Sequence, residues 1–203
     1  MSASLSGLMP LALTDREGHP DAVETALRLG TQPLVHVVGR LHQRGDLIAR
    51  AALLRNFLLM EGAPDTVSLV RQFAARLPKA RLGVVVNPFL TGELERLHAK
   101  VAAGAHFYVA QAGWDDRAYQ ELLAGGPKIP ALASVLCVGP KLARAVARGE
   151  IVGVRLPPGL ATDHPIERLA ERIRTLLTMG FSGVHIAGIR RPETVERLLA
   201  LLQ

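Results

Sequence analysis

Polar side chains recur where the short apolar runs of this sequence end, and they are the residues best suited to chemistry. These residues are Thr14, His36, Glu61, Asn87, Gln111, Cys137 and Arg191. If the runs are parallel strands, their carboxyl ends share one rim, where barrel and open-sheet proteins bind ligands. The pattern therefore predicts a ligand site at that rim.

Taken one by one, these residues leave alternatives open. The Gln111 amide offers both a donor and an acceptor, which suits the edge of a heterocycle, but a structural role fits it equally well. A strand-end histidine such as His36 more often makes a structural hydrogen bond than a ligand contact. Cys137 lies within an apolar run, which favours a small core residue over a nucleophile.

Several common motifs are absent from the sequence. No GxGxxG follows an apolar run, and neither GxxxxGK[ST] nor HExxH occurs. The remaining histidines lack metal-ligand spacing, and a single cysteine cannot form an internal disulfide. A Rossmann nucleotide site, a P-loop and a zinc site are therefore not expected.

The apolar runs and the stretches between them predict an α/β fold. The runs are 8–14, 33–38, 56–61, 82–89, 105–111, 129–138 and 183–189. Helical periodicity, with capping residues or terminal glycines, covers 20–29, 46–54, 65–77, 92–103, 115–123, 141–148, 165–179 and 192–201. This alternation predicts one domain, residues 1–203: a TIM-type (β/α) barrel, incomplete because it has seven clear strands and a closed barrel has eight. Residues 151–156 are either a weak strand or a buried loop.

Composition limits the partners and the compartment. The net charge is +6, but the arginines are scattered over helix faces among glutamates, which favours solvated surfaces or an anionic small ligand over nucleic acid. No apolar run approaches the roughly 20 residues that span a bilayer. With 49% apolar residues, one cysteine and no signal-peptide pattern at the start, we expect a soluble cytoplasmic protein.

Two segments carry a family resemblance. The segment 82–89, LGVVVNPF, and the segment 93–111, ELERLHAKVAAGAHFYVAQ, resemble methylenetetrahydrofolate reductase, a flavin-dependent (β/α)-barrel enzyme. Residues 115–122, 129–157 and 183–186 fit the same family. The resemblance implies a bound FAD, with FMN as the alternative, and a reduced electron donor. It also implies reduction of 5,10-methylenetetrahydrofolate to 5-methyltetrahydrofolate, a step of one-carbon metabolism and methionine biosynthesis.

The resemblance also assigns roles to residues. Those implied for the flavin are Thr14, His36, Gly62, Asn87, Glu93, Arg96 and Lys100. The last three share a helical face, where they would hold the ribose and pyrophosphate. Gln111 would contact folate and nicotinamide, and Arg191 would lie near the folate's glutamate tail.

Two departures from the family pattern keep other functions open. Nothing before residue 8 could form the strand whose glutamate protonates folate, and residues 61–63 read Glu-Gly-Ala where the family has an aspartate beside the flavin. The alternatives are a degenerate homologue that binds folate, flavin or a partner subunit without turnover, and a barrel with no ligand. Unpaired strand edges predict a homo-oligomer or a partner subunit that supplies the missing strand.

Overall fold

The computed structural model describes residues 34–37, 56–60, 65–148, 150, 165–187 and 192–203. Within them, six strands form one parallel sheet in the order β1-β2-β3-β4-β5-β6. The strands are β1 Leu34–Val37, β2 Asn56–Leu59, β3 Arg81–Val86, β4 Phe107–Ala110, β5 Ala131–Leu136 and β6 Gly183–Ala187. The predicted parallel α/β architecture is confirmed. The expected strand 8–14, the helices 20–29 and 46–54, and the segment 151–156 lie outside the described residues.

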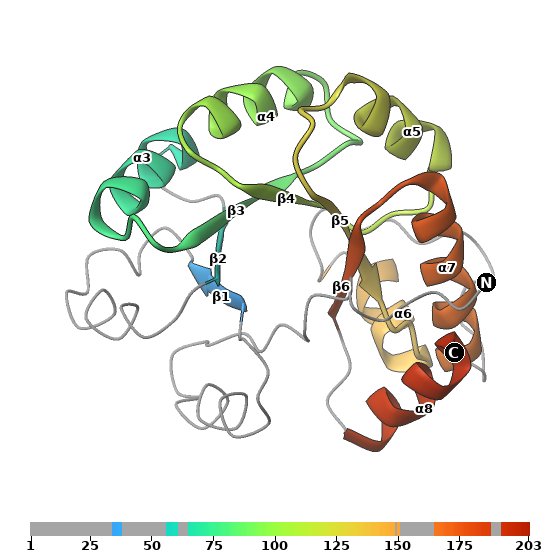
Figure 1. The fold of residues 1–203 in the computed structure, drawn as a ribbon. Coiled ribbons are helices and arrows are strands. Elements are labelled where there is room, and N and C mark those ends of the chain that lie inside the picture. The colour runs from blue at the N-terminus through green and yellow to red at the C-terminus, as the bar shows by residue number, and fades with distance from the viewer. Residues whose placement is uncertain (1–33, 38–55, 61–64, 149, 151–164, 188–191) are drawn as a thin grey trace.

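In the described part of the chain, six helices accompany these strands. They are α3 Thr66–Arg76, α4 Glu93–Ala102, α5 Asp116–Gly125, α6 Pro140–Ala147, α7 Pro165–Met179 and α8 Pro192–Leu202. Helices α3, α4, α5 and α7 lie along the convex side of the curved sheet (Figure 1). None of the helices in the described ranges is long and apolar enough to cross a membrane.

Local chemistry explains where the helices begin and end. The Asp65 carboxylate accepts hydrogen bonds from the Val67 and Ser68 amides, at 3.2 and 3.3 Å, and so caps α3. Asp115 caps α5 in the same way. Helix α4 is followed by Gly104, whose φ of 117° favours a residue without a side chain. The boundaries of these helices therefore match the sequence expectation to within about two residues.

Alternation along each strand separates two apolar layers. Outward-facing residues such as Phe57, Val84 and Tyr108 belong to the main core. The same core contains Leu97 of α4 and Ile173 of α7, so these strand residues face the helices.

A smaller cluster fills the concave face. Leu58, Phe107, Val109 and Leu132 form it, and Met60 and Val85 pack against them. Gly83 of β3 is paired with Phe107 of β4. A Cβ atom at position 83 would lie 2.2 Å from two atoms of the Phe107 ring, so glycine provides the space that this ring occupies.

A contact between the two end strands of the sheet shows how far it curls. His36 lies in β1 and His185 in β6, at opposite ends of the strand order, yet their ring centroids are 5.1 Å apart. A flat sheet of six strands would separate its end strands by more than 20 Å at about 4.8 Å a step. The sheet therefore bends around a central axis, as in a barrel.

Candidate functional site

The carboxyl ends of β3, β4 and β5 meet at one rim, where the sequence predicts a ligand site. Asn87 follows β3, Gln111 follows β4, and Cys137 follows β5. The structure therefore brings Asn87 and Gln111 to the same edge of the sheet. Thr14, Glu61, Gly62 and Arg191, which the sequence analysis also assigned to the site, lie outside the described residues.

Asn87 and the start of α4 form a compact polar turn. The Asn87 side-chain oxygen accepts a hydrogen bond from the Phe89 amide, and the Asn87 amide donates to Glu93 at 3.1 Å. The other Glu93 oxygen accepts from the Arg96 guanidinium at 2.7 Å. The Glu93 carboxylate is thus buried between a backbone donor and a side-chain cation.

Lys100 lies two turns further along the same helix. It is 3% exposed, and its ammonium group donates to the Val85 carbonyl of β3 at 2.8 Å. This contact joins α4 to β3. Lys100 therefore lies between the helix and the sheet, whereas Arg96 is largely exposed to solvent. The assignment of Glu93, Arg96 and Lys100 to a flavin stays a prediction.

The backbone of Gln111 is held on both sides. Its amide donates to the Val86 carbonyl at 2.8 Å, and its carbonyl accepts from the Tyr119 hydroxyl at 2.7 Å. Tyr119 is fully buried, and burial raises its pKa to about 12, so the hydroxyl keeps its proton. The half-buried side-chain amide of Gln111 makes no hydrogen bond with any residue of the described part.

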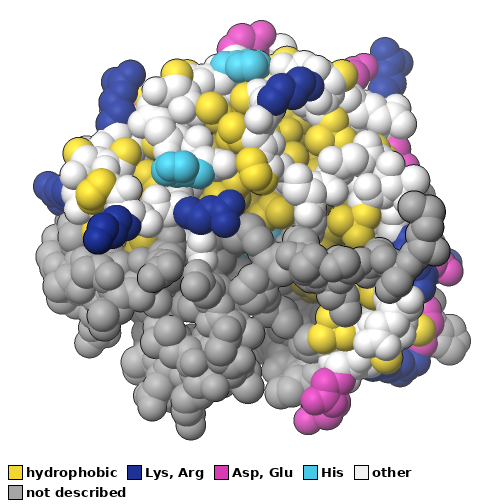
Figure 2. Space-filling model, in the orientation of Figure 1, with side chains coloured by type: hydrophobic (Ala, Val, Ile, Leu, Met, Phe, Trp, Pro, Cys, Tyr) yellow, Lys and Arg dark blue, Asp and Glu magenta, His cyan; other side chains and the backbone are white. Residues whose placement is uncertain are grey.

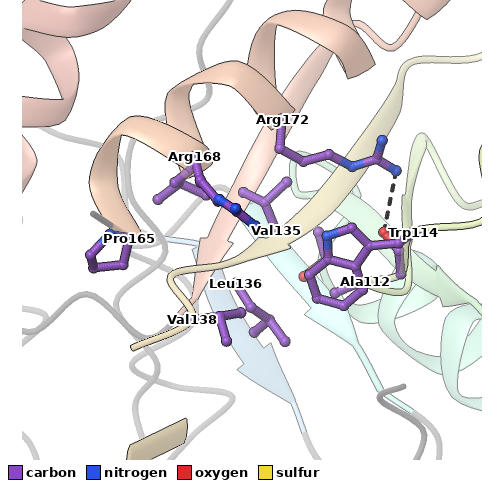
Figure 3. Close-up of a pocket in the computed structure, with 11 residues that line it drawn as sticks. Ala112, Trp114, Val135, Leu136, Val138, Pro165, Arg168 and Arg172 are labelled. Carbon is purple, nitrogen blue, oxygen red and sulfur yellow. Dashed lines mark hydrogen bonds between the residues drawn. The ribbon is translucent and has the colours of Figure 1, made fainter. Parts of the chain in front are cut away.

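A pocket opens at Ala112, the residue after Gln111, between the β4–α5 loop, the end of β5 and the start of α7 (Figure 3). It is a depression open to solvent, with a volume of about 410 Å³ when the open space is counted. Its described lining is Ala112, Gly113, Trp114, Ser134, Val135, Leu136, Val138, Pro165, Arg168, Leu169 and Arg172. We call it the Trp114 pocket.

Arg172 fixes one wall of the Trp114 pocket. Its guanidinium donates to Asp116 at 2.6 Å and to the Gly113 carbonyl at 3.2 Å, and it lies 5.6 Å from the centre of the Tyr119 ring. These contacts tie α7 to the loop that carries Trp114. The sequence analysis missed Trp114, Tyr119 and Arg172. Only Trp114 gave a signal, as a lone tryptophan just after a strand end.

The concave face holds two histidines. The Nε2 atom of His36 is buried and has no hydrogen-bond partner in the described part of the chain. His185 Nδ1 lies 3.2 Å from the Ser134 hydroxyl. Burial lowers the pKa of both imidazoles to about 4, and in His36 the neighbouring His185 adds to the effect. Both rings are therefore neutral at neutral pH, and His36 can offer a ligand an uncharged donor or acceptor.

Other groups at the rim give less support for chemistry. Cys137 is half-buried against the main core, and burial raises the pKa of its thiol, which disfavours the thiolate that a nucleophile requires. Among the described residues, no group of three histidine, cysteine or acidic side chains could hold a metal ion. On the face shown in Figure 2, the basic side chains stand apart from one another rather than in one patch.

Comparisons with known proteins identify the fold. No family model matches the sequence, and no curated protein matches it. An uncharacterized Clostridium thermocellum protein that binds two copies of 5-methyl-5,6,7,8-tetrahydrofolic acid superposes with a TM-score of 0.61. The match has 14% identity and covers 98% of this chain and 84% of the other.

Two further solved structures match over most of the chain. An archaeal fructose-1,6-bisphosphate aldolase has a TM-score of 0.53 and 12% identity, covering 97% of this chain and 95% of its own. A putative phosphonomutase from Burkholderia cenocepacia J2315 has a TM-score of 0.53 and 15% identity, and the match covers 90% of this chain and 73% of the phosphonomutase. At these identities the likeness shows a shared fold, the (β/α) architecture of TIM-barrel enzymes.

Proposed function

We propose that this protein binds a reduced folate at the rim formed by the carboxyl ends of β3, β4 and β5. The Clostridium thermocellum protein of similar fold binds 5-methyltetrahydrofolate, and its likeness extends over almost the whole chain. The resemblance of residues 82–89 and 93–111 to a folate enzyme points to the same ligand.

The observation that carries this proposal is the state of Gln111. Its backbone is fixed by Val86 and Tyr119, while its side-chain amide has no partner among the described residues. The pterin ring of a folate presents alternating donors and acceptors along its edge. The Gln111 side-chain amide can pair with one donor and one acceptor of that edge, and the held backbone keeps its point of attachment in place.

Titration calorimetry with 5-methyltetrahydrofolate tests this proposal. Gln111→Ala should weaken binding about 10-fold or more, because the pterin ring loses a hydrogen-bonding partner. Gln120→Ala is the matched control. It replaces the same type of residue by alanine, at a position of α5 that is exposed to solvent. Absence of binding by the wild-type protein, or equal affinity in the two variants, would contradict the proposal.

We propose, as a finer function, that the protein is a flavin-dependent methylenetetrahydrofolate reductase. A bound FAD would supply the hydride for the methylene carbon. The buried Nε2 of His36 favours this function, because an uncharged nitrogen on the concave face suits a polar atom of a flat heterocycle. The described residues suit the flavin ring better than the pyrophosphate of FAD. Glu93 and Lys100, which the resemblance assigns to the ribose and pyrophosphate, bond instead to the Asn87 amide and the Val85 carbonyl.

Flavin absorbance separates the reductase from a folate-binding protein without turnover. After incubation with FAD and gel filtration, the reductase should retain the yellow flavin spectrum, and 5-methyltetrahydrofolate should bleach it under anaerobic conditions. A protein that binds 5-methyltetrahydrofolate but remains colourless would exclude the reductase and leave the folate-binding function.

A further inference from the structure

The loop between β4 and α5 is held by side chains from two helices. The Tyr119 hydroxyl of α5 lies 2.7 Å from the Gln111 carbonyl oxygen and 3.5 Å from that of Gly113. A hydroxyl has one proton to donate, and the shorter contact takes it, so Tyr119 bonds to Gln111. Arg172 of α7 donates to the Gly113 carbonyl at 3.2 Å (Figure 3). The first residues of the loop are therefore bonded to both helices.

Packing fixes the ring of Tyr119. The ring is fully buried, with the edge-on rings of Phe89 and Phe181 at centroid distances of 5.5 and 5.4 Å. The Arg172 guanidinium lies 5.6 Å from its centre. Because the ring is held by these neighbours, its hydroxyl points in one direction, and the hydrogen bond constrains Gln111 rather than Tyr119.

The bond to Tyr119 removes the last backbone freedom of Gln111. The Gln111 amide donates to the Val86 carbonyl at 2.8 Å, which holds the nitrogen but leaves the residue free to turn about φ. That rotation moves the carbonyl and the Cβ atom together. Holding the carbonyl oxygen with Tyr119 therefore fixes the direction in which the Gln111 side chain leaves the strand.

We propose that Tyr119 is a positioning residue for ligand binding, which acts by holding the Gln111 carbonyl, and that Arg172 supports the same loop at Gly113. This inference rests on the proposed folate function. It assigns part of the folate affinity to side chains that act through Gln111, because an amide that is already oriented loses less freedom when it binds the pterin.

Tyr119→Phe tests the proposal, because it keeps the packed ring and removes only the hydroxyl. Calorimetry should show 5-methyltetrahydrofolate binding about 3- to 10-fold more weakly, and no more weakly than in Gln111→Ala. Tyr108→Phe is the matched control, at the other tyrosine of the chain. Tyr108 is also buried, but its hydroxyl lies next to Gly126, at the opposite end of α5 from the loop. This control should bind folate as the wild type does.

A double-mutant cycle separates positioning from a general loss of structure. In the Gln111→Ala background, Tyr119→Phe should leave the affinity for 5-methyltetrahydrofolate unchanged, because no side-chain amide is left to orient. A merely structural role would weaken binding by the same factor in both backgrounds, and that result would overturn the proposal.

Urea unfolding shows whether Tyr119→Phe is folded under the conditions of the assay. If it is not, Arg172→Met, which removes the donor to the Gly113 carbonyl, is put through the same cycle with the same expectation. If Gln111→Ala weakens folate binding and the positioning variant does not, the inference is wrong and the folate function stands. If the wild-type protein does not bind 5-methyltetrahydrofolate, both are wrong.

Discussion

Replacing Gly83 with alanine tests whether the concave face of the sheet is packed as described. The added Cβ would lie 2.2 Å from Cε2 and Cζ of Phe107 and 2.8 Å from its Cδ2. Carbon atoms in good contact are about 3.5–4.0 Å apart, so the ring or the strand has to move by roughly 1 Å or more. Phe107 is fully buried among Leu58, Val109 and Leu132, which leaves little room for that movement.

The expected cost is large for a single methyl group. Overpacking of a buried site costs about 1–3 kcal/mol, and we expect the upper part of this range because the obstacle is a rigid ring. Urea unfolding should show a lower midpoint with an unchanged slope. The double variant Gly83→Ala with Phe107→Leu should recover part of the loss relative to the sum of the single changes, because the shorter side chain frees space for the new methyl.

Gly139→Ala provides the matched control for this experiment. In the described part of the chain, no atom beyond the two neighbouring residues lies within 4 Å of a Cβ at position 139, and the backbone there has φ −83°, which any residue adopts. This variant should unfold close to the wild-type midpoint. The reasoning is refuted if Gly83→Ala is as stable as Gly139→Ala, since Phe107 would then not occupy the space above Gly83.

Two further predictions concern buried polar groups. Burial lowers the pKa of His36 and His185 from 6.5 to about 4, so the unfolded chain takes up protons in this window that the folded chain does not. The contribution of these histidines to the free energy of unfolding should therefore be constant above pH 6.5 and should fall as the pH drops from 6.5 toward about 4. In a variant with both histidines changed to glutamine, the free energy of unfolding should fall less steeply over the same range. Urea unfolding at a series of pH values measures this dependence. The prediction is contradicted if the free energy of unfolding changes with pH equally in the wild-type protein and in the variant. Lys100→Met should lower the free energy of unfolding by about 1–3 kcal/mol, because the Val85 carbonyl loses the donor that bonds it in the structure. The control Lys79→Met, at an exposed position, should change it little. Equal stability of the two variants in urea unfolding would contradict this prediction.

Much of the fold could be predicted because its signals are local. Runs of apolar residues identify the six described strands, and capping aspartates mark the starts of α3 and α5. The closeness of His36 and His185 could not be predicted in this way. It depends on the curl of the whole sheet, which no single segment encodes.

The candidate site was predictable only where a residue directly follows a strand. Asn87 and Gln111 met that condition, and the structure brings both to one rim. Arg172 and Tyr119 did not, because they lie on helices and reach the rim through contacts distant in sequence, such as that between Arg172 and Gly113. The spacing of Glu93, Arg96 and Lys100 predicted a shared helical face. It could not predict that the Lys100 ammonium would be bonded to the Val85 carbonyl of β3.

The structure of a complex with 5-methyltetrahydrofolate tests the central claim most directly. The account predicts the pterin edge within hydrogen-bonding distance of the Gln111 side-chain amide. A folate bound on another face, for example in the acidic groove between α4 and α5 lined by Glu95 and Glu121, would contradict it.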